Sequence, residues 1–333
     1  MTEPLLNVEN LAISFFTRDH EVRAVRDISF SVNKGEILGI VGESGSGKSV
    51  TAYSIMGLLK QNGKITGGNI TYKGDSLIGR SEADMRKIRG NEIAMVFQDP
   101  MTSLNPVFTV GRQISDIIRR HRDLDKSAAR DEAIRMLELV GIPAAAERYN
   151  SYPHEFSGGM RQRVLIAMAL SCSPDLLIAD EPTTALDVTI QAQILDLLLE
   201  LKTKLDISIM LITHDLGVVA NTCKRVVIMY GGLIMEEGTV EDIFLRPMHP
   251  YTQGLLKALP NTIDEAKRRL VPIPGNPPDP SQAMPGCPFA ERCPHVMPIC
   301  REQRPDYYTR DEQRAMCWLA DETQQEKGNS DEA

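Results

Sequence analysis

Short apolar runs separated by charged, periodic segments predict that strands and helices alternate along most of this chain. Residues 5–40 show the two-residue alternation of strands and end in the apolar run EILGIVG, which predicts short strands and then a buried strand leading into a Gly-rich turn. Apolar runs return in DLLIAD (175–180), ISIMLITH (207–214) and RVVIMY (225–230), with the amphipathic segment IQAQILDLLLELKTKL between the first two. This alternation predicts an α/β fold with a parallel sheet covered by helices.

Two stretches depart from the alternation. Residues 116–140 are charged and have a helical period, with Gly141 and Pro143 as stop signals, so we expect a helical subdomain at about residues 99–170. After Pro247, a helical piece, YTQGLLKAL, leads into the proline-rich VPIPGNPPDPSQAMPG, which lacks the backbone donors that a sheet needs. We therefore expect a core over residues 1–260 and an extension over residues 261–333.

Charge and hydropathy narrow the class of protein. The chain carries 37 Lys and Arg against 45 Asp and Glu, and its net charge of -8 disfavours nucleic acid as a partner. No apolar run approaches the roughly 20 residues that cross a bilayer, and the N-terminus MTEPLLNVEN lacks the pattern of a signal peptide. We expect a cytoplasmic protein that is able to bind a membrane partner.

The segment GESGSGKS (42–49) matches the phosphate-loop pattern G-x-x-x-x-G-K-[ST] and lies between a predicted strand and the helical VTAYSIMGLL. Its glycines let backbone N–H groups face the phosphates of a nucleotide, while the lysine adds a positive charge and the last serine a ligand for Mg²⁺. A Gly-rich turn with a chance lysine is the alternative, which the flanking strand and helix disfavour. The candidate binding residues are Gly42, Ser44, Gly45, Ser46, Gly47, Lys48, Ser49 and Val50.

Two acidic residues follow the apolar strand in LLIADEP. Adjacent side chains on a strand point to opposite faces, so the two acids are suited to different tasks. We expect Asp180 to hold Mg²⁺, directly or through water, and Glu181 to orient or polarise the attacking water. The alternative is that these are two surface acids at a strand end. The presence of a phosphate loop in the same chain disfavours this alternative.

The segment FSGGMRQRVLIAMAL predicts a second anion-binding helix start. Ser157 is suited to cap the helix, and Gly158 and Gly159 allow close approach of a ligand to the backbone. The phosphate loop is already expected to bind one nucleotide. We therefore expect this second surface to contact a nucleotide that is bound to another copy of the chain or to a homologue. An ordinary capped helix with a Gly-Gly entry is the alternative.

Four of the six cysteines lie in the extension, at Cys287, Cys293, Cys300 and Cys317, with spacers of five, six and sixteen residues. Four thiolates suit a soft metal centre. The spacers are longer than in common structural zinc sites, which favours an iron-sulfur cluster over zinc, while disulfides fit a cytosolic protein poorly. His249 and His295 are spare potential ligands, but we expect both to be ordinary surface residues.

At these motifs, over about residues 5–260, the chain resembles the ATP-binding subunits of ABC transporters. The resemblance rests also on SGGMRQ, on the ALD turn (185–187), on Gln98 in VFQDPMTSLNP and on His214 in LITHD. It implies a P-loop NTPase fold that works as a head-to-tail dimer. Phe156 and Met160 depart from the family's usual Leu and Gln, which puts ribose contacts by Met160 in doubt.

The resemblance also implies roles for individual residues. Gln98 would bind Mg²⁺ and sense the water, and the turn-rich loop PMTSLNP after it would contact the membrane subunits. His214 would contact the γ-phosphate, and Asp187 would bridge the two subunits of the dimer. Phe15, with Phe16 as the near alternative, would stack on adenine. Each has a plain competitor, such as a core aromatic or a satisfied polar residue at a strand end.

The tail segments HPYTQGLLKALP, IPGNPPDP and CPFAERCPH resemble the C-terminal extension of oligopeptide and dipeptide permease ATPases, and the oligopeptide branch more closely. This implies a subunit at the cytoplasmic face of the bacterial inner membrane that hydrolyses ATP to energise peptide uptake. The implied partners are a second homologous ATPase, two transmembrane permease subunits and an extracytoplasmic peptide-binding protein. The implied cofactors are ATP, Mg²⁺ and a 4Fe-4S cluster on the four cysteines, with zinc as the alternative metal.

A soluble ABC-type ATPase that acts on nucleic acid or ribosomes is the alternative function. Such proteins usually fuse two cassettes, whereas this chain has one phosphate loop and one SGGMRQ segment. The net negative charge of the chain also disfavours binding to nucleic acid.

Overall fold

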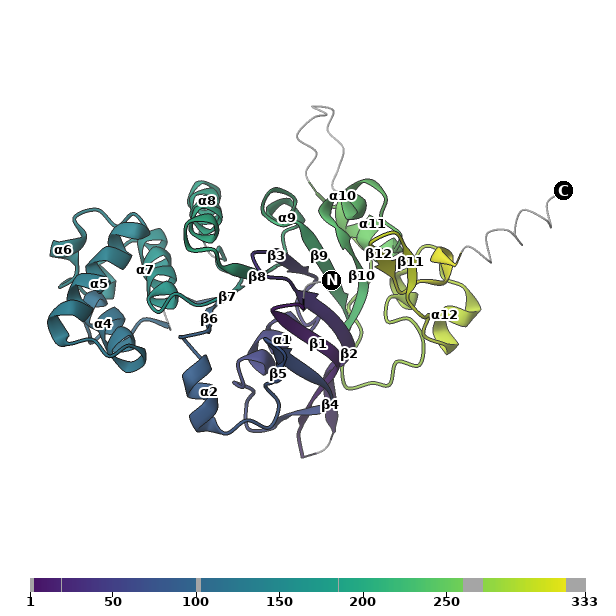
Figure 1. Cartoon of the computed structure of the whole chain (residues 1–333). Helices are drawn as coiled ribbons and strands as arrows, with labels where there is room; N and C mark the ends of the chain where they lie inside the picture. Colours follow the sequence, from purple (N-terminus) through teal and green to yellow (C-terminus); the bar gives the residue numbers. More distant parts are fainter. Residues whose placement is uncertain (1–2, 19, 100–102, 185, 260–271, 322–333) are drawn as a thin grey trace, which may run out of the picture. The chain divides into compact units, whose positions relative to one another are not determined.

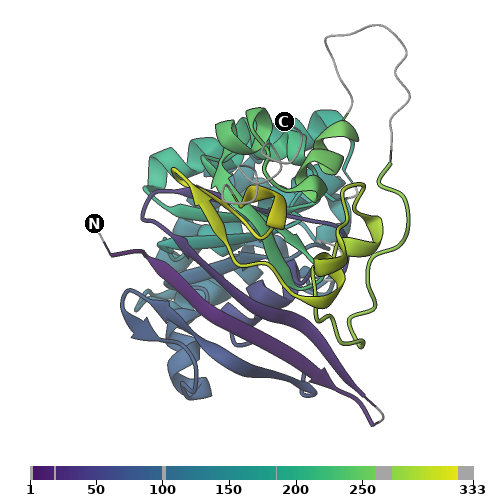
Figure 2. The same ribbon diagram turned by 90° about the vertical axis from the view of Figure 1, so that its right-hand side faces the viewer.

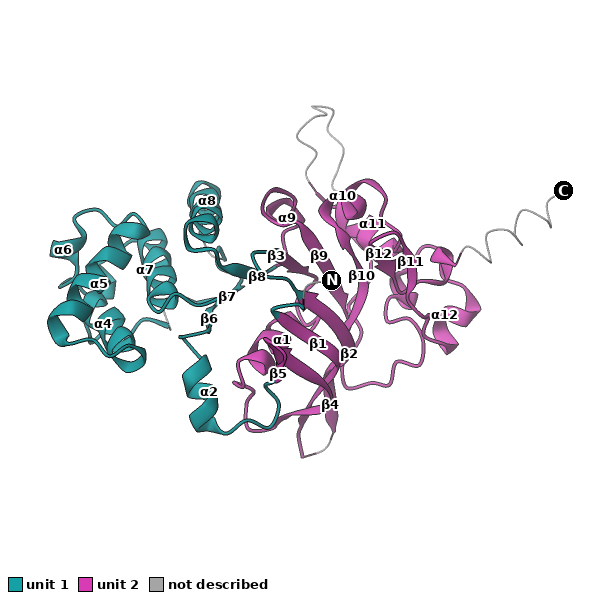
Figure 3. Ribbon diagram, in the orientation of Figure 1, with its two compact units in different colours: residues 1–5, 32–37, 76–212 teal, residues 6–31, 38–75, 213–333 magenta. Residues whose placement is uncertain are grey.

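The computed structural model describes residues 3–18, 20–99, 103–184, 186–259 and 272–321. Residue contacts divide the chain into two compact units, which Figure 3 colours separately. Unit 1 comprises residues 1–5, 32–37 and 76–212, and unit 2 comprises residues 6–31, 38–75 and 213–333. Both units are therefore assembled from separate stretches of sequence. Figure 1 labels their helices and strands.

Unit 1 contains three parallel strands, β6 (Ile93–Val96), β7 (Leu176–Asp180) and β8 (Ser208–Thr213). Strand β7 lies in the middle and pairs with β6 from Leu176↔Ile93 and with β8 from Leu176↔Ser208. Every residue of the three strands is buried, as expected for parallel strands covered on both faces. Strands β7 and β8 are joined through helix α8 (Val188–Leu205), as the apolar runs predict.

The remaining helices of unit 1 include a group packed against one another. Helix α4 contacts α5 and α7, and α5 contacts α6 and α7, over the stretch where we expect a helical subdomain. Asp125 caps α5 by accepting a hydrogen bond from the Ala128 N–H at 2.8 Å, and Gly141 follows the end of α5 with φ +74°. The helices are α2 (Glu82–Ile88), α4 (Val110–His121), α5 (Lys126–Leu139), α6 (Ala145–Arg148) and α7 (Gly158–Leu170), with the 3-10 turn η1 (Pro153–Glu155).

Unit 2 contains an antiparallel sheet in the order β2-β1-β4-β5. Strands β1 (Leu6–Phe16) and β2 (Glu21–Val32) have 11 and 12 residues, so the prediction of short strands here is wrong. Alternation alone indicates a strand but not its length, because a long twisted strand and two short ones share the same period. The other two strands are β4 (Gly63–Tyr72) and β5 (Asp75–Ser76).

Five further strands of unit 2 follow the order β11-β12-β10-β9-β3. Only β3 (Ile37–Val41) and β9 (Arg225–Tyr230) pair in parallel, and the other neighbours are antiparallel. The expected parallel sheet is therefore mixed. Gly231 and Gly232, at φ +57° and +80°, let the chain reverse tightly after β9. The last three strands are β10 (Leu233–Thr239), β11 (Tyr308–Arg310) and β12 (Gln313–Ala315).

The helices of unit 2 are short. No helix among the described residues is long and apolar enough to span a membrane. They are α1 (Lys48–Ile55), α9 (Leu216–Thr222), α10 (Val240–Leu245), α11 (Pro250–Lys257) and α12 (Pro298–Glu302), with the 3-10 turns η2 (Ala290–Arg292) and η3 (Trp318–Ala320).

The C-terminal extension shares its core with the rest of unit 2. Phe289 and Met316 of the extension belong to the same buried cluster as Val41 at the end of β3 and Tyr230 at the end of β9. Strand β12 also adds to the edge of β10, and Figure 2 shows this yellow hairpin beside the green strands. The proline-rich residues 272–285 form no helix or strand, as predicted.

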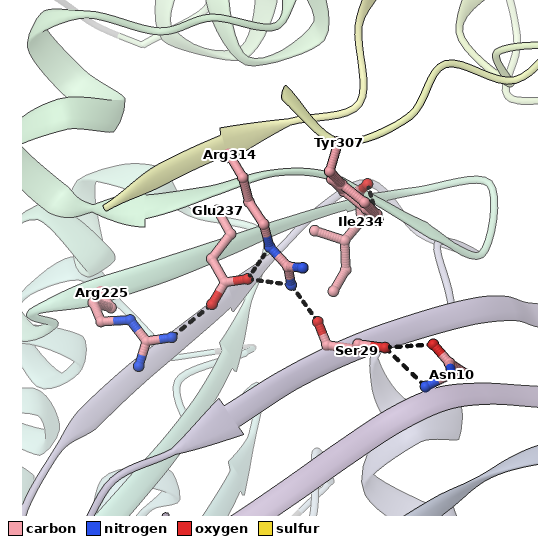
Figure 4. Close-up of polar contacts among 7 residues, drawn as sticks. All are labelled: Asn10, Ser29, Arg225, Ile234, Glu237, Tyr307 and Arg314. Carbon is pink, nitrogen blue, oxygen red and sulfur yellow. Dashed lines mark hydrogen bonds and ion pairs between the residues drawn. The ribbon is translucent and has the colours of Figure 1, made fainter. Parts of the chain in front are cut away.

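A buried carboxylate holds the terminal hairpin in place (Figure 4). Glu237 on β10 accepts hydrogen bonds from Arg225 on β9 at 2.6 Å and from the Arg314 Nε on β12 at 2.8 Å. Arg314 also donates to the carbonyl of Ser29 on β2 and lies 4.7 Å from the centre of the Tyr307 ring. Only 9% of the Glu237 side chain is exposed, so one carboxylate bridges two arginines away from bulk water.

We expect Glu237→Gln to lower the free energy of unfolding by about 1–3 kcal/mol, because it removes the negative charge that two partly buried guanidinium groups contact. Urea unfolding can be followed by the fluorescence of Trp318, the single tryptophan, whose ring centre lies 6.3 Å from that of Tyr308 on β11. Glu291→Gln is the matched control, because it removes an ion pair with Arg301 in which 79% of the Glu291 side chain is exposed. Equal urea midpoints for the two variants would contradict the assigned role of Glu237.

Candidate functional site

The segment from Gly42 to Ser49 connects the fully buried strand β3 to helix α1. Gly45 and Gly47 have φ values of +79° and +101°, in the left-handed region that glycine tolerates. A Cβ atom on Gly42 would lie 2.1 Å from the carbonyl oxygen of Met229. The loop therefore needs glycine both for its turns and for its close approach to the end of β9.

The lysine of this loop lies inside it. The Lys48 ammonium donates to the carbonyl oxygens of Gly42 at 2.7 Å and Glu43 at 3.0 Å, and the residue is only 6% exposed. Ser44 and Gly45 form the exposed tip of the loop, and Ser49 and Val50 are half-buried in the first turn of α1. This turn has no acidic side chain, so its N–H groups and the ammonium create a positive environment suited to phosphate.

In unit 1, Gln98 and Glu181 are brought together from positions 83 residues apart. One carboxylate oxygen of Glu181, Oε2, accepts hydrogen bonds from the Gln98 Nε2 at 3.0 Å and from the Thr184 hydroxyl at 2.8 Å. The Glu181 backbone has φ +47° and its N–H donates to the Ile212 carbonyl on β8 at 2.9 Å. Asp180, the preceding residue, is fully buried at the end of β7. The two acids thus occupy different environments, as their adjacency predicts.

The start of α7 is capped as the sequence predicts. The Ser157 hydroxyl accepts a hydrogen bond from the Met160 N–H at 3.3 Å, and Ser157 and Gly158 are exposed. A Cβ on Gly159 would lie 2.6 Å from the Ile190 side chain, so glycine allows α7 to approach α8 closely. Asp187, also exposed, caps α8 by accepting from the Ile190 N–H at 3.0 Å.

The candidate aromatic and histidine residues belong to unit 2. Phe15 is half-buried with its ring against Gly63, whereas Phe16 is 43% exposed, with the Lys64 ammonium 5.9 Å from its ring centre. His214 is exposed and follows β8 directly. Residues 100–102 of the expected membrane-facing loop and residue 185 of the ALD turn lie outside the described residues.

The four C-terminal cysteines line one small cavity, although they come from separate segments. Cys287 precedes η2 and Cys293 follows it, Cys300 lies on α12, and Cys317 lies between β12 and η3. No disulfide joins any of the six cysteines, all of which lie among the described residues. Burial raises the pKa of Cys287 to about 12 and of Cys317 to about 11, and the neighbouring thiols of the group add to both shifts. These thiols are neutral at pH 7, so a metal that binds them must displace protons. No three His, Cys, Asp or Glu side chains in the described part of the chain are arranged to hold a metal ion.

His249 lines the same cavity and is 1% exposed, so the expectation of a surface residue is wrong. Its Nδ1 accepts a hydrogen bond from the Tyr251 N–H at 2.9 Å, and burial lowers its pKa to about 3. The neutral ring therefore carries its proton on Nε2, which is buried and has no hydrogen-bond partner. His295 also lines the cavity but is exposed.

Comparisons with known proteins place these features in a family. A family model described as ABC transporter matches residues 25–184, and one described as oligopeptide/dipeptide transporter, C-terminal region, matches residues 235–300. The dipeptide transport ATP-binding protein DppD of Bacillus subtilis (strain 168) is 54% identical over 322 residues, which are 96% of each chain. The oligopeptide transport ATP-binding protein OppD of Escherichia coli (strain K12) is 53% identical over 303 residues, 91% of this chain and 89% of that protein.

The chain belongs to the family of oligopeptide and dipeptide ABC transporter ATP-binding subunits. Its fold is the P-loop NTPase fold of ABC ATPases, as the motifs predict. The solved ATP-binding cassette MJ0796, in a dimeric post-hydrolysis state bound to ADP and Pi, is 26% identical with a TM-score of 0.64. This match covers 71% of the present chain and 98% of that one.

Three further residues, which the sequence motifs do not identify, contact Glu181 or the phosphate loop. Thr184 donates to Glu181, while Tyr251 and Arg292 both contact Glu43 in the phosphate loop. Thr184 lies three residues after Glu181 in the segment DEPTTALD (180–187), and a hydroxyl so close to the acid is a local signal of this contact. Tyr251 and Arg292 lie 208 and 249 residues from Glu43, and no local pattern marks such pairs.

We expect Gly42→Ala to destabilise this ABC transporter subunit by about 1–3 kcal/mol, because the added methyl meets a backbone carbonyl that has no room to shift. Thermal unfolding measures the loss. Gly67→Ala is the control: its added Cβ would meet nothing closer than Ala12 at 3.7 Å, and its φ is not positive. A melting temperature for Gly42→Ala equal to that of Gly67→Ala would show that the loop has more freedom than its contacts indicate.

Proposed function

We propose that this chain hydrolyses ATP to energise the uptake of oligopeptides or dipeptides, as the peripheral subunit of an ABC importer at the cytoplasmic face of the bacterial inner membrane. The observation that carries this proposal is the phosphate loop, with its buried Lys48, in a chain that resembles peptide-transport ATP-binding subunits over nearly its whole length. The named relatives act in dipeptide and oligopeptide transport, and the family assignment includes the C-terminal region specific to those transporters.

In this proposal the phosphate loop binds the nucleotide's phosphates. The N–H groups of the loop and the first turn of α1 receive the β- and γ-phosphates, Lys48 leaves its loop carbonyls to contact them, and Ser49 and Asp180 hold Mg²⁺. The exposed loop tip and half-buried Ser49 and Val50 support this assignment. An aromatic at Phe15 or Phe16 stacks on adenine, and the greater exposure of Phe16 favours it.

Glu181 is proposed to polarise the attacking water. Its hydrogen bonds from Gln98 and Thr184 fix the carboxylate in one orientation, and a carboxylate is able to orient water and accept its proton. Gln98, exposed and directly bonded to Glu181, is then able to report the state of the water and Mg²⁺ to a partner. His214, exposed after β8, is proposed to contact the γ-phosphate.

The complete enzyme is proposed to be a heterodimer with a homologous ATP-binding subunit. Ser157, Gly158 and Gly159 at the start of α7, with the exposed Asp187, offer an anion-binding surface for the partner's nucleotide. The solved relative MJ0796 is dimeric with ADP and Pi bound. Two transmembrane permease subunits and an extracytoplasmic peptide-binding protein complete the proposed importer, and nucleic acid is not a partner.

The four C-terminal cysteines are proposed to hold a 4Fe-4S cluster through Cys287, Cys293, Cys300 and Cys317. Four thiols that face one cavity are the donor set that such a cluster requires. The unpartnered Nε2–H of His249 at this cavity fits a sulfur acceptor, and zinc is the alternative metal for the same four thiols. When bound, such a cluster would supply electron-transfer capacity or structural cross-linking, and His249 would be available to donate its Nε2–H to a sulfur atom.

We expect Glu181→Gln to retain MgATP binding and to lower hydrolysis at least about 100-fold, because an amide cannot accept the proton of water. Lys48→Ala should instead weaken MgATP binding, since it removes the charge that faces the phosphates. Phosphate release and nucleotide affinity separate the two effects. Glu200→Gln, an exposed acid paired with Lys204 on α8, is the matched control and should behave as the wild type. Unchanged hydrolysis in Glu181→Gln would remove Glu181 from the proposed mechanism.

We expect the anaerobically purified chain to absorb visible light and to contain about four iron and four sulfide per chain. Cys287→Ser should lower both contents, because a serine hydroxyl is a poorer iron ligand. Cys172→Ser is the control, since Cys172 belongs to unit 1 and does not line the cavity. If the preparation contains zinc without iron, the site binds zinc and the cluster proposal is wrong. If it contains neither metal, the cysteines do not form a metal site.

A further inference from the structure

Glu43, the second residue of the phosphate loop, is held from two sides by residues of the C-terminal part of unit 2. The Arg292 Nη1 donates to the Glu43 Oε2 at 2.7 Å. The Glu43 N–H donates to the Tyr251 hydroxyl at 3.1 Å. Both the side chain and the backbone of one loop residue are therefore fixed by segments more than 200 residues away.

Arg292 is a buried junction, with only 6% of its side chain exposed. Besides Glu43, it donates to the Tyr230 hydroxyl at 2.9 Å, to the Pro274 carbonyl at 2.9 Å and to the Ile273 carbonyl at 3.2 Å. Burial lowers its pKa, but the hydrogen bonds to Glu43 and Tyr230 outweigh burial and raise the pKa overall. The rigid guanidinium therefore has all of these hydrogen-bond acceptors only when the phosphate loop, the end of β9 and the proline-rich residues 272–285 are in place.

Tyr251 is fully buried and equally constrained. Its ring lies 4.6 Å from the Tyr230 ring and 5.3 Å from the Phe289 ring, measured between centres. Because this aromatic packing fixes the ring, the hydroxyl that accepts the Glu43 N–H has a fixed position. Removing the hydroxyl alone would leave the packing intact and the loop amide without its partner.

We propose that Arg292 and Tyr251 are positioning residues for ATP: they hold the phosphate loop at Glu43 in the conformation that receives the nucleotide's phosphates. The proposal rests on the assignment of this loop as the nucleotide site. The two glycines with positive φ, Gly45 and Gly47, make the segment after Glu43 conformationally free, so an anchor before them lowers the entropy lost when phosphates bind. Neither residue needs to touch the nucleotide.

The extension itself offers a matched pair of arginines. Arg292 directly precedes Cys293, and Arg301 directly follows Cys300. Arg301 pairs with the exposed Glu291 at 3.0 Å, whereas Arg292 pairs with the phosphate loop. Arg301→Gln therefore removes the same charge beside a cysteine of the same cavity without touching Glu43.

The test measures MgATP affinity, KM and kcat on the full-length chain. We expect Arg292→Gln to weaken MgATP affinity roughly tenfold, with KM raised in proportion and kcat changed less, because the chemistry of the bound nucleotide is intact. Arg292→Lys should recover part of the affinity, since it restores the charge but not the fork of donors. Tyr251→Phe should weaken affinity in the same direction, and Arg301→Gln should bind as the wild type.

A double-mutant cycle makes the pairing specific. Glu43→Gln should weaken affinity like Arg292→Gln, and the double variant should be no weaker than the worse single variant. Additive losses, or Arg292→Gln binding MgATP like Arg301→Gln, would overturn the proposal. Melting temperatures and metal contents, measured on the same preparations, confirm that each variant is folded.

Lys48→Ala separates this proposal from the one on which it rests. If Lys48→Ala binds MgATP as tightly as the wild type, the loop is not the nucleotide site and the proposed function fails. If Lys48→Ala loses binding while Arg292→Gln and Tyr251→Phe retain it, the nucleotide site stands and only the positioning role is overturned.

Discussion

The packing of Tyr230, Tyr251 and Phe289 is the interaction on which much of unit 2 depends. Tyr230 ends strand β9, Tyr251 lies on α11, and Phe289 lies between Cys287 and Cys293 in the sequence. Their ring centres are 4.6–5.5 Å apart, within the range of favourable aromatic contacts. Through these three rings the extension becomes part of the ATPase core rather than a tail attached to it.

The arrangement explains how polar groups are tolerated in this interior. A buried arginine is costly unless it is paired and its donors are satisfied. Arg292 pairs with Glu43 on the phosphate loop and donates to Tyr230, while Glu237 accepts hydrogen bonds from Arg225 and Arg314 at the terminal hairpin. The pairs Arg292–Glu43 and Arg314–Glu237 each connect the extension to an earlier segment of unit 2. The buried charges that need a partner therefore also fix the position of the extension.

The sequence predicts the local parts of the site well, and the reason is physical. A strand, a Gly-rich turn and a helix follow one another within the phosphate loop, and Ser157 caps the helix that it precedes, so neighbouring residues determine these features. The mixed sheet escaped prediction because the Gly231-Gly232 reversal makes β10 antiparallel, and Leu233–Thr239 contains two glutamates that obscure the apolar run. Those glutamates, Glu236 and Glu237, are buried because Arg and amide donors from distant segments satisfy them.

Long-range pairs set the limit of sequence reasoning for the site itself. In CPFAERC, Arg292 resembles any surface charge beside a turn, and in HPY the histidine resembles a polar helix cap. Only the fold shows that both residues are buried and that one contacts the phosphate loop while the other lines the cysteine cavity. Coupling between two sites is reciprocal in free energy. If the extension holds Glu43 in place for the nucleotide, a bound nucleotide that fixes the loop must stabilise the extension to the same degree.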